Sequence, residues 1–473
     1  RRYITNMIVN RFVSAAAAAL LALAPLVRPA AGTVEVQLDI RQSRWELRPG
    51  LTTTAWSYNG VVPGTPIVAR VGDRLVIDAR NRLPVPTNIH WHGLEVPNDQ
   101  DGPGTAMEPG ASRRYEFVLN RSGTYWYHSH RMPVLPQVDR GLYGPLVVLA
   151  AEDAAYTADH VLVLDDWLLG ADGRRLEGSG AGEMERVGNV ETVNGKTGDA
   201  IPALTFTAGG LYKLRFVNAS TAAVHTMRIA GHRLRVTHLD GHGVARPWLA
   251  DSITLSPGER IDVEVEAVGR PGDSFAIESA RPRFGIRIPI RYSSASMAAV
   301  ASPYRPPAPS APVGVLGRSP DHVLVLNSAM GMGGGMMGGG MMDGAGGGHG
   351  MHGGGPMPAM ASMMRWTING LSYPETEPLF VRVGEVVKVR FENRDTGMMH
   401  PMDHPIHLHG TRFLVVAVNG TPPDQELWKD TVSVPAGGSV DIAFAMPLPG
   451  EWMLHCHILD HEDGGMMTVV IAE

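Results

Sequence analysis

Short runs in which apolar and polar residues alternate recur along residues 33–473, and Gly, Pro, Asn or Asp bound most of them. Such runs predict β-strands separated by turns. No long stretch has the 3.6-residue periodicity of an amphipathic helix, so we expect an all-β fold. The clearest strand patterns are residues 34–38, 74–78 and 114–118 in the first third, 161–164, 212–217, 233–237 and 261–265 in the middle, and 323–326, 386–391, 413–418 and 440–444 in the last third.

Parts of this pattern repeat. Residues 71–76 resemble residues 383–388, and both shortly precede a histidine cluster. Asn81, Asn218 and Asn393 follow strands that look equivalent. The repetition favours three similar β-sandwich domains. We expect an export signal in residues 1–32, the first domain in 33–152, the second in 153–315 and the third in 316–473, with an insertion at 330–364.

Composition is compatible with this organisation. The chain has 473 residues, 44% of them hydrophobic and 19% charged, which is typical of a packed protein of several domains. Its 56 glycines and 36 prolines suit an all-β chain with many turns. The net charge of −6 gives no reason to expect nucleic-acid binding.

The first 32 residues are predicted to be an export signal. Arg1, Arg2 and Arg11 are basic, and residues 13–27 are apolar and rich in Ala and Leu. Fifteen residues are few for a membrane span, so we expect a removable signal and no stable membrane insertion afterwards. The alternative is that the segment is a transmembrane anchor. The Arg1-Arg2 pair suggests a twin-arginine signal, which exports folded proteins. The expected location is the periplasm or another exported compartment.

A single cysteine, Cys456, lies between His455 and His457. One cysteine cannot form an intramolecular disulfide, and its histidine neighbours favour metal binding. Because side chains alternate along a strand, both histidines would face one way and Cys456 the other, so one strand could serve two metal sites. His461 and Met466 follow closely, and Cys, His and a weak axial Met form the donor set of a blue-copper centre.

Three other clusters contain His-x-His pairs, which on strands would place two imidazoles on one face. Imidazole alone leaves the metal open among copper, zinc, iron and nickel, whereas the thiolate and thioether favour copper. The clusters are His90-Trp91-His92, His128-Ser129-His130 and His404-Pro405-Ile406-His407-Leu408-His409.

The four clusters, in this order, resemble those of the multicopper oxidases. Carried over by position, the resemblance implies that His404, Cys456 and His461 bind a type 1 copper with Met466 as axial ligand. It also implies a type 2 copper bound by His90 and His407, and a type 3 copper pair bound by His92, His128, His130, His409, His455 and His457.

The resemblance further implies three cupredoxin-like Greek-key domains holding four copper ions. The trinuclear cluster would lie between the first and third domains, and the copper-free middle domain would act mainly as a spacer. Electrons would enter at the type 1 copper, pass along Cys456 and reduce O2 to water. We expect four histidines of the middle domain to be structural: His225, His232, His238 and His242.

Two carboxylates and one methionine match further positions of the family. Asp101 and Glu462 would deliver protons for O2 reduction. Met402 matches a methionine near the substrate site of cuprous oxidases, whereas His400 occupies a position where an acidic residue is expected. Asp403 could compensate for that departure.

Residues 330–364 contain eleven of the 24 methionines, with His349 and His352, in a background of glycine. Thioethers select Cu(I), and this composition cannot form a packed core. A Met-rich insertion in the third domain resembles the bacterial copper-efflux oxidases. We therefore expect a monomeric oxidase of Cu(I), and of small aromatic reductants such as phenols and aromatic amines, that acts in copper tolerance. The alternatives are a laccase without that role and a non-enzymatic copper-binding protein, which would have no use for a complete ligand set. A copper nitrite reductase should lack the combination of clusters in the third domain.

Overall fold

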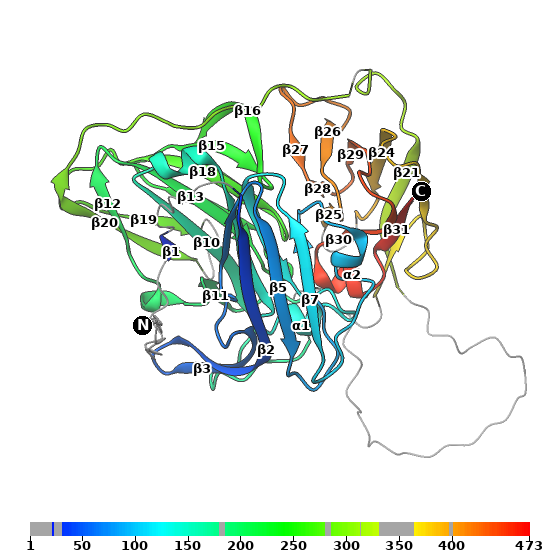
Figure 1. The fold of residues 1–473 in the computed structure, drawn as a ribbon, viewed down its shortest axis with the longest axis horizontal. Helices are drawn as coiled ribbons and strands as arrows, with labels where there is room; N and C mark the ends of the chain where they lie inside the picture. The colour runs from blue at the N-terminus through cyan, green and yellow to red at the C-terminus, as the bar shows by residue number, and fades with distance from the viewer. Residues whose placement is uncertain are drawn as a thin grey trace, which may run out of the picture.

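The computed structural model describes residues 21–22, 31–178, 185–279, 285–312, 314–330, 364–396 and 401–473. Strands dominate these residues, so the all-β prediction is confirmed. They form six sheets within the described ranges, and the sheets pair into three sandwiches that follow one another along the chain. In Figure 1 the first sandwich occupies the centre, between the middle and third sandwiches. Most of the predicted signal and of the Met-rich segment lies outside the described residues.

The first sandwich packs a four-stranded sheet against a second four-stranded sheet. Its core is aromatic, with Trp91, Tyr115 and Tyr127 all at 0% exposure. The first sheet comprises β2 (Thr33–Arg48), β3 (Leu51–Tyr58), β5 (Arg74–Asn81) and β7 (Ser112–Val118), and the second β4 (Ile67–Arg70), β6 (His90–His92), β8 (Gly123–His128) and β9 (Tyr143–Leu149).

The middle sandwich has its own aliphatic core, which includes Leu214, Val263 and Ile288. One sheet contains β1 (Leu21–Ala22), β10 (Ala158–Trp167), β11 (Val190–Val193), β13 (Leu211–Asn218), β15 (Leu234–Leu239), β16 (His242–Ala250) and β18 (Arg260–Glu266), and the other β12 (Leu204–Ala208), β14 (His225–Ile229), β17 (Ser252–Leu255), β19 (Ser274–Ser279) and β20 (Arg287–Ser296).

The third sandwich buries Cys456 and Met466 in the same core as Phe391 and Trp452. One sheet contains β21 (His322–Met330), β22 (Met364–Ile368), β24 (Val387–Asn393), β26 (Phe413–Val418), β27 (Trp428–Lys429) and β29 (Ser439–Phe444), and the other β23 (Leu379–Val381), β25 (His404–Leu408), β28 (Thr431–Val434), β30 (Gly450–Cys456) and β31 (Met467–Ala472).

The internal repetition of the sequence has a structural counterpart. In each sandwich an early strand pairs in parallel with the strand that ends in the repeated asparagine: β2 with β5, β10 with β13, and β21 with β24. Asn81, Asn218 and Asn393 are nearly fully buried, and each amide group donates two hydrogen bonds to backbone carbonyls. Because a buried amide needs such partners, the repeated asparagine ties each strand end to the loops beside it.

Two short α-helices contribute few residues to the fold, but both lie at junctions between domains. The first is α1 (Leu135–Val138), and the second is α2 (Leu459–Asp463), which contains His461 and Glu462. Three 3-10 turns occur elsewhere in the described chain: η1 (Asn98–Gln100), η2 (Ala151–Ala155) and η3 (Gly198–Ala200). None of the described helices reaches the length and apolarity of a membrane-spanning segment.

Candidate metal centres

Cys456 and two histidines form a compact buried cluster inside the third sandwich. Cys456 ends β30 and lies opposite Ile406 of β25, which also carries His404. The sulfur of Cys456 is 3.5 Å from Nδ1 of His461 and 3.8 Å from Nδ1 of His404, and the two Nδ1 atoms are 3.1 Å apart. Three soft or borderline donors thus converge on one small volume, as a copper or zinc site requires.

Met466 is fixed beside this cluster by the backbone. Its amide donates to the carbonyl oxygen of His461 at 2.8 Å, and its own carbonyl oxygen accepts from the amide of Cys456 at 3.0 Å. The residue has 0% exposure. The thioether is therefore buried next to the chain segments that carry the thiol and one imidazole.

Sequence reasoning missed the groups that surround these ligands. Trp366 of β22 stacks on the ring of His461 with a centroid distance of 3.5 Å. Asp395 lies 3.5 Å from Nε2 of His404, and Glu185 lies 3.6 Å from Nε2 of His461. These residues come from separate segments, and no local pattern in the sequence marks them.

The eight remaining histidines meet where the first sandwich faces the third. Strand pairing positions the histidines within each sandwich, because His90 lies opposite His128 and His407 lies opposite His455. Ring stacking positions the two groups relative to each other across the junction: His90 stacks on His409, and His92 stacks on His407, each with a centroid distance of 3.7 Å. Every one of the eight is at most 3% exposed.

The six residues expected to bind the type 3 copper pair lie in two trios within this group. In one, Nε2 of His455 lies 3.3 Å from Nε2 of His130 and 3.2 Å from Nε2 of His409. In the other, the ring of His457 lies 5.1 Å from that of His92 and 5.5 Å from that of His128. The predicted alternation therefore holds at the end of β30, since Cys456 faces one cluster, and His455 before it and His457 just after the strand face the other.

The hydrogen bonds leave one nitrogen of several rings free. In His90, His128 and His407, Nδ1 lies 2.8–3.1 Å from a backbone carbonyl oxygen, and Nε2 has no hydrogen-bond partner among the described residues. His92 is reversed: Nε2 contacts Asp430 at 3.2 Å, and Nδ1 is the atom without a described partner. A buried polar atom without a partner is costly, and metal coordination would satisfy it.

The protonation of these rings also suits metal binding. Burial lowers the pKa of His407 to about 4 and that of His130 to about 3. Both rings are then neutral at physiological pH, and the neutral imidazole is the form that binds metals. Burial raises the pKa of the Cys456 thiol, so a bound cation is needed to hold it as the thiolate. The donor set fits the four copper ions that the sequence implies.

Both predicted carboxylates lie against the histidine clusters. Asp101 is 2% exposed, and its Oδ2 lies 2.8 Å from Nδ1 of His409. Glu462 has 0% exposure and lies 3.2 Å from Nδ1 of His455 and 3.3 Å from Nε2 of His130. Burial opposes ionisation of Glu462, but the interaction with His455, and to a smaller extent with His130, outweighs it and lowers the pKa of the carboxyl to about 2.

The other predicted residues have different surroundings. Met402 is 8% exposed and packs in the same core as Cys456. Asp403 is exposed and accepts a hydrogen bond from the amide of Ala436 at 2.9 Å. His400 lies outside the described residues.

Three of the four middle-domain histidines expected to be structural have polar contacts within their own sandwich. His225 lies 2.8 Å from the hydroxyl of Ser220, and His232 lies 2.7 Å from that of Tyr292. His238 lies 3.0 Å from the hydroxyl of Thr237, and His242 is buried. The middle domain is expected to act mainly as a spacer, but it also contacts the histidine clusters. A Cβ built on Gly258 would lie 2.7 Å from the ring of His457.

Comparison with known proteins agrees with this geometry. Three family models, each described as multicopper oxidase, match residues 39–153, 158–289 and 355–473. The multicopper oxidase MmcO of Mycobacterium tuberculosis is 31% identical, covering 94% of this chain and 88% of the relative. A laccase of Trametes hirsuta is 28% identical, covering 98% and 94%.

Solved structures share the fold over nearly the whole chain. A multicopper oxidase from Campylobacter jejuni, described as a metallo-oxidase, superposes with a TM-score of 0.76 at 26% identity, covering 96% of this chain and 94% of that one. One from Pseudomonas thermotolerans gives 0.72 at 27% identity, covering 94% and 100%. The predicted cupredoxin-like sandwiches are confirmed. The chain belongs to the multicopper oxidase family, whose members are oxidoreductases that hold four copper ions and use O2 as the electron acceptor.

Proposed function

We propose that this multicopper oxidase is an exported cuprous oxidase that couples one-electron oxidation of Cu(I) to four-electron reduction of O2 to water in copper tolerance. Phenols and aromatic amines would be additional reductants. We further propose that the enzyme acts as a monomer in the periplasm or another exported compartment.

We propose the copper ligands residue by residue. His404, Cys456, His461 and Met466 would hold the type 1 copper, and His90 and His407 the type 2 copper. Support comes from the convergence of buried donors described above. The type 3 pair would be held by His92, His128, His130, His409, His455 and His457, whose contacts within two trios are described above. Bound copper supplies one-electron redox chemistry at the first site and O2 reduction at the second.

Residues of the protein itself would connect the two copper sites and control proton transfer. Cys456 is bonded through the backbone to His455 and His457, so one short segment would join the two copper sites covalently. Asp101 and Glu462 would accept hydrogen bonds from histidine ligands and would hold or transfer protons beside them.

The observation that carries the choice of Cu(I) is the position of the Met-rich segment. Its two ends, Met330 and Met364, are paired residues of the hairpin formed by β21 and β22. Two residues after Met364, Trp366 stacks on His461. The segment is thus attached beside the proposed type 1 copper, where soft thioethers could collect Cu(I).

The test replaces the nine methionines between residues 331 and 363 by Leu, which keeps the length and apolar character of the segment. A second variant replaces residues 331–363 by a short Gly/Ser linker. Loop length changes folding free energy only slowly, so both variants should fold. We expect Cu(I) oxidation at low copper to fall in both, while oxidation of a bulky phenol is unchanged in the first and unchanged or faster in the second.

Unchanged Cu(I) and phenol kinetics in both variants would favour the laccase alternative. That alternative has support of its own, because several curated relatives at 27–30% identity are named laccase.

A further inference from the structure

Asp430 lies where all three sandwiches meet and is not one of the proposed ligands. It has 0% exposure and joins β27 to β28. Its Oδ1 is 3.2 Å from Nε2 of His92 in the first sandwich, and its carbonyl oxygen accepts from Nδ1 of His407 at 2.8 Å. The hydroxyl of Thr431 lies 3.2 Å from each of these nitrogens. One short segment therefore contacts a proposed type 3 ligand and a proposed type 2 ligand.

The carboxylate of Asp430 is held by an arginine of the middle sandwich. Arg260, the first residue of β18, has 0% exposure and donates from Nη1 and Nη2 to the two carboxylate oxygens at 2.7 and 2.6 Å. Its Nε donates to the carbonyl oxygen of Thr124 in the first sandwich at 3.1 Å. A bidentate pair fixes the plane of a carboxylate as well as its position.

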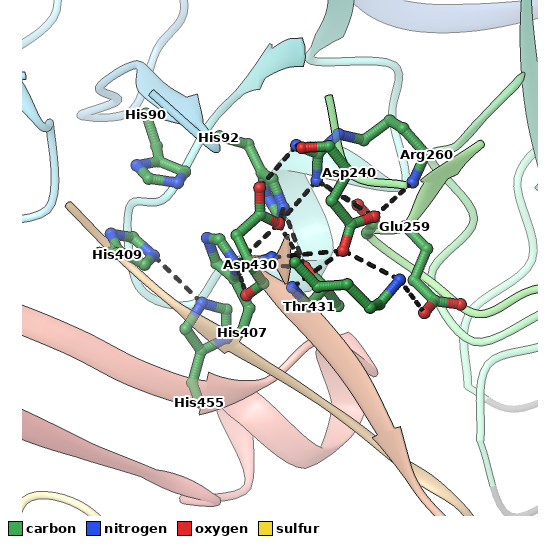
Figure 2. A network of polar contacts seen from close by, with 12 residues as sticks. His90, His92, Asp240, Glu259, Arg260, His407, His409, Asp430, Thr431 and His455 are labelled. Atoms are coloured by element: carbon green, nitrogen blue, oxygen red, sulfur yellow. Dashed lines mark hydrogen bonds and ion pairs between the residues drawn. The ribbon is translucent and has the colours of Figure 1, made fainter. Parts of the chain in front are cut away.

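A second layer fixes the arginine in turn. Asp240 accepts from the amide of Arg260 at 2.9 Å, and its other carboxylate oxygen lies 3.1 Å from Nζ of Lys429. Glu259 lies 2.9 Å from the same Nζ. Figure 2 shows Asp430 between this group and the histidines. The close approach needs glycine at position 93, because a Cβ there would overlap both Arg260 and Asp430.

Asp430 could itself be a metal ligand, since it lies within reach of the nitrogens of His92 and His407. The geometry argues against this, because Arg260 occupies both carboxylate oxygens and would repel a cation placed there. The carboxylate has a different use, because its Oδ1 lies 3.2 Å from Nε2 of His92 and 3.5 Å from Nδ1 of His407. A ring that donates from Nε2 presents Nδ1, and a ring that donates from Nδ1 presents Nε2. These are the atoms without described partners in His92 and His407.

We infer that Asp430, held by Arg260, is a positioning residue that sets the ring orientation of His92 and His407. The middle domain thereby takes part in building the trinuclear site. This inference rests on the proposed assignment of the two histidines as copper ligands.

The test substitutes Asp430→Asn, which keeps the shape of the side chain but removes the charge that Arg260 holds. We expect the trinuclear copper to be lost to a chelator at about 10- to 100-fold lower chelator concentration than in the wild type, as is typical when a partner of a metal ligand is removed. The type 2 electron paramagnetic resonance signal should change its hyperfine splitting. The blue band of the type 1 site should remain, because Asp430 contacts none of its proposed ligands.

Two further variants distinguish a specific effect on the copper site from a general loss of folding stability. The control Asp159→Asn removes the charge of one carboxylate from another buried bidentate contact, in which Arg215 donates to Asp159 at 2.8 and 2.7 Å in the middle sandwich. Arg215 keeps its contacts with Asp153 and Asp262 in this control. The control should lower the melting temperature without altering the type 2 signal. The double variant Asp430→Asn/Arg260→Gln leaves no unpaired charge, so it should regain much of the melting temperature but not the copper affinity. If Asp430→Asn does not fold, the double variant answers the question alone.

Wild-type copper retention and an unchanged type 2 signal in the variants that lack the Asp430 carboxylate would overturn the inference, as would a double variant that recovers both stability and copper affinity. His92→Ala and His407→Ala separate this failure from failure of the ligand assignment. If these two retain the trinuclear copper, the proposed ligands are wrong. If they lose it while Asp430→Asn keeps it, the positioning role alone is wrong.

Discussion

At the scale of single residues, Cys456 has a role that no other donor in the chain can replace. It supplies the only thiol of the sequence, and that thiol is buried 3.5 Å from Nδ1 of His461. A serine hydroxyl cannot provide the thiolate that defines a type 1 site. Cys456→Ser should therefore abolish the intense blue charge-transfer band and oxidase turnover while leaving the trinuclear copper largely bound. Absorption spectra and copper content check this, and a variant that stays blue would refute the assignment.

The two buried carboxylates make a second prediction at this scale. Asp101→Asn and Glu462→Gln keep the side-chain shape but remove groups that can exchange protons. Each should slow reoxidation of the reduced enzyme by O2 by about 100-fold, the usual contribution of general acid-base catalysis. Reduction of the type 1 site should change much less, which provides an internal control. Stopped-flow traces with unchanged reoxidation in both variants would show that neither carboxylate relays protons.

At the scale of elements, the turn between β17 and β18 packs directly on a proposed ligand. Gly258 has φ +85°, and a Cβ there would lie 2.7 Å from the ring of His457. Gly272 also follows a proline and also has φ +85°, but nothing lies within 4 Å of its Cβ position. Both Gly→Ala changes carry the backbone strain of the left-handed region, and only the first adds overlap.

We therefore expect Gly258→Ala to lower the free energy of unfolding by about 2 kcal/mol more than Gly272→Ala, the usual cost of overpacking. Denaturant titration of the copper-free proteins measures this difference. Gly258→Ala should also weaken retention of the trinuclear copper. Equal losses in the two variants would mean that the turn can move away from His457 at little cost.

The elements also explain what the sequence could predict. Alternating patterns and turn residues located the strands, and His-x-His spacing on β6 and at the end of β25 indicated candidate ligands because a strand fixes side-chain direction locally. The contact between Asp430 and Arg260 could not be predicted from the sequence, because the two residues are 170 positions apart. Which ring nitrogen of His92 is free also depends on that contact, so no local pattern could predict it.

At the scale of the whole molecule, the copper sites depend on how the sandwiches meet. Helix α2 carries His461 and Glu462, and the acidic residues on either side of that pair bind other domains. Asp463 accepts from the amides of Val134 and Leu135 at 2.6 and 3.0 Å, beside α1 of the first sandwich. Asp460 accepts from the amide of Arg186 in the middle region at 2.6 Å. Domain packing and ligand geometry are therefore coupled.

The proposed reductant is the property that most needs measurement, and O2 uptake by the copper-loaded enzyme tests it most directly. Cu(I) and a bulky phenol are supplied side by side at matched concentrations, with the Met→Leu segment variant as control. We predict a kcat/KM for Cu(I) well above that for the phenol, and loss of this advantage in the variant. Phenol oxidation that equals or exceeds Cu(I) oxidation in the unmodified enzyme would contradict the proposed cuprous oxidase and establish a laccase.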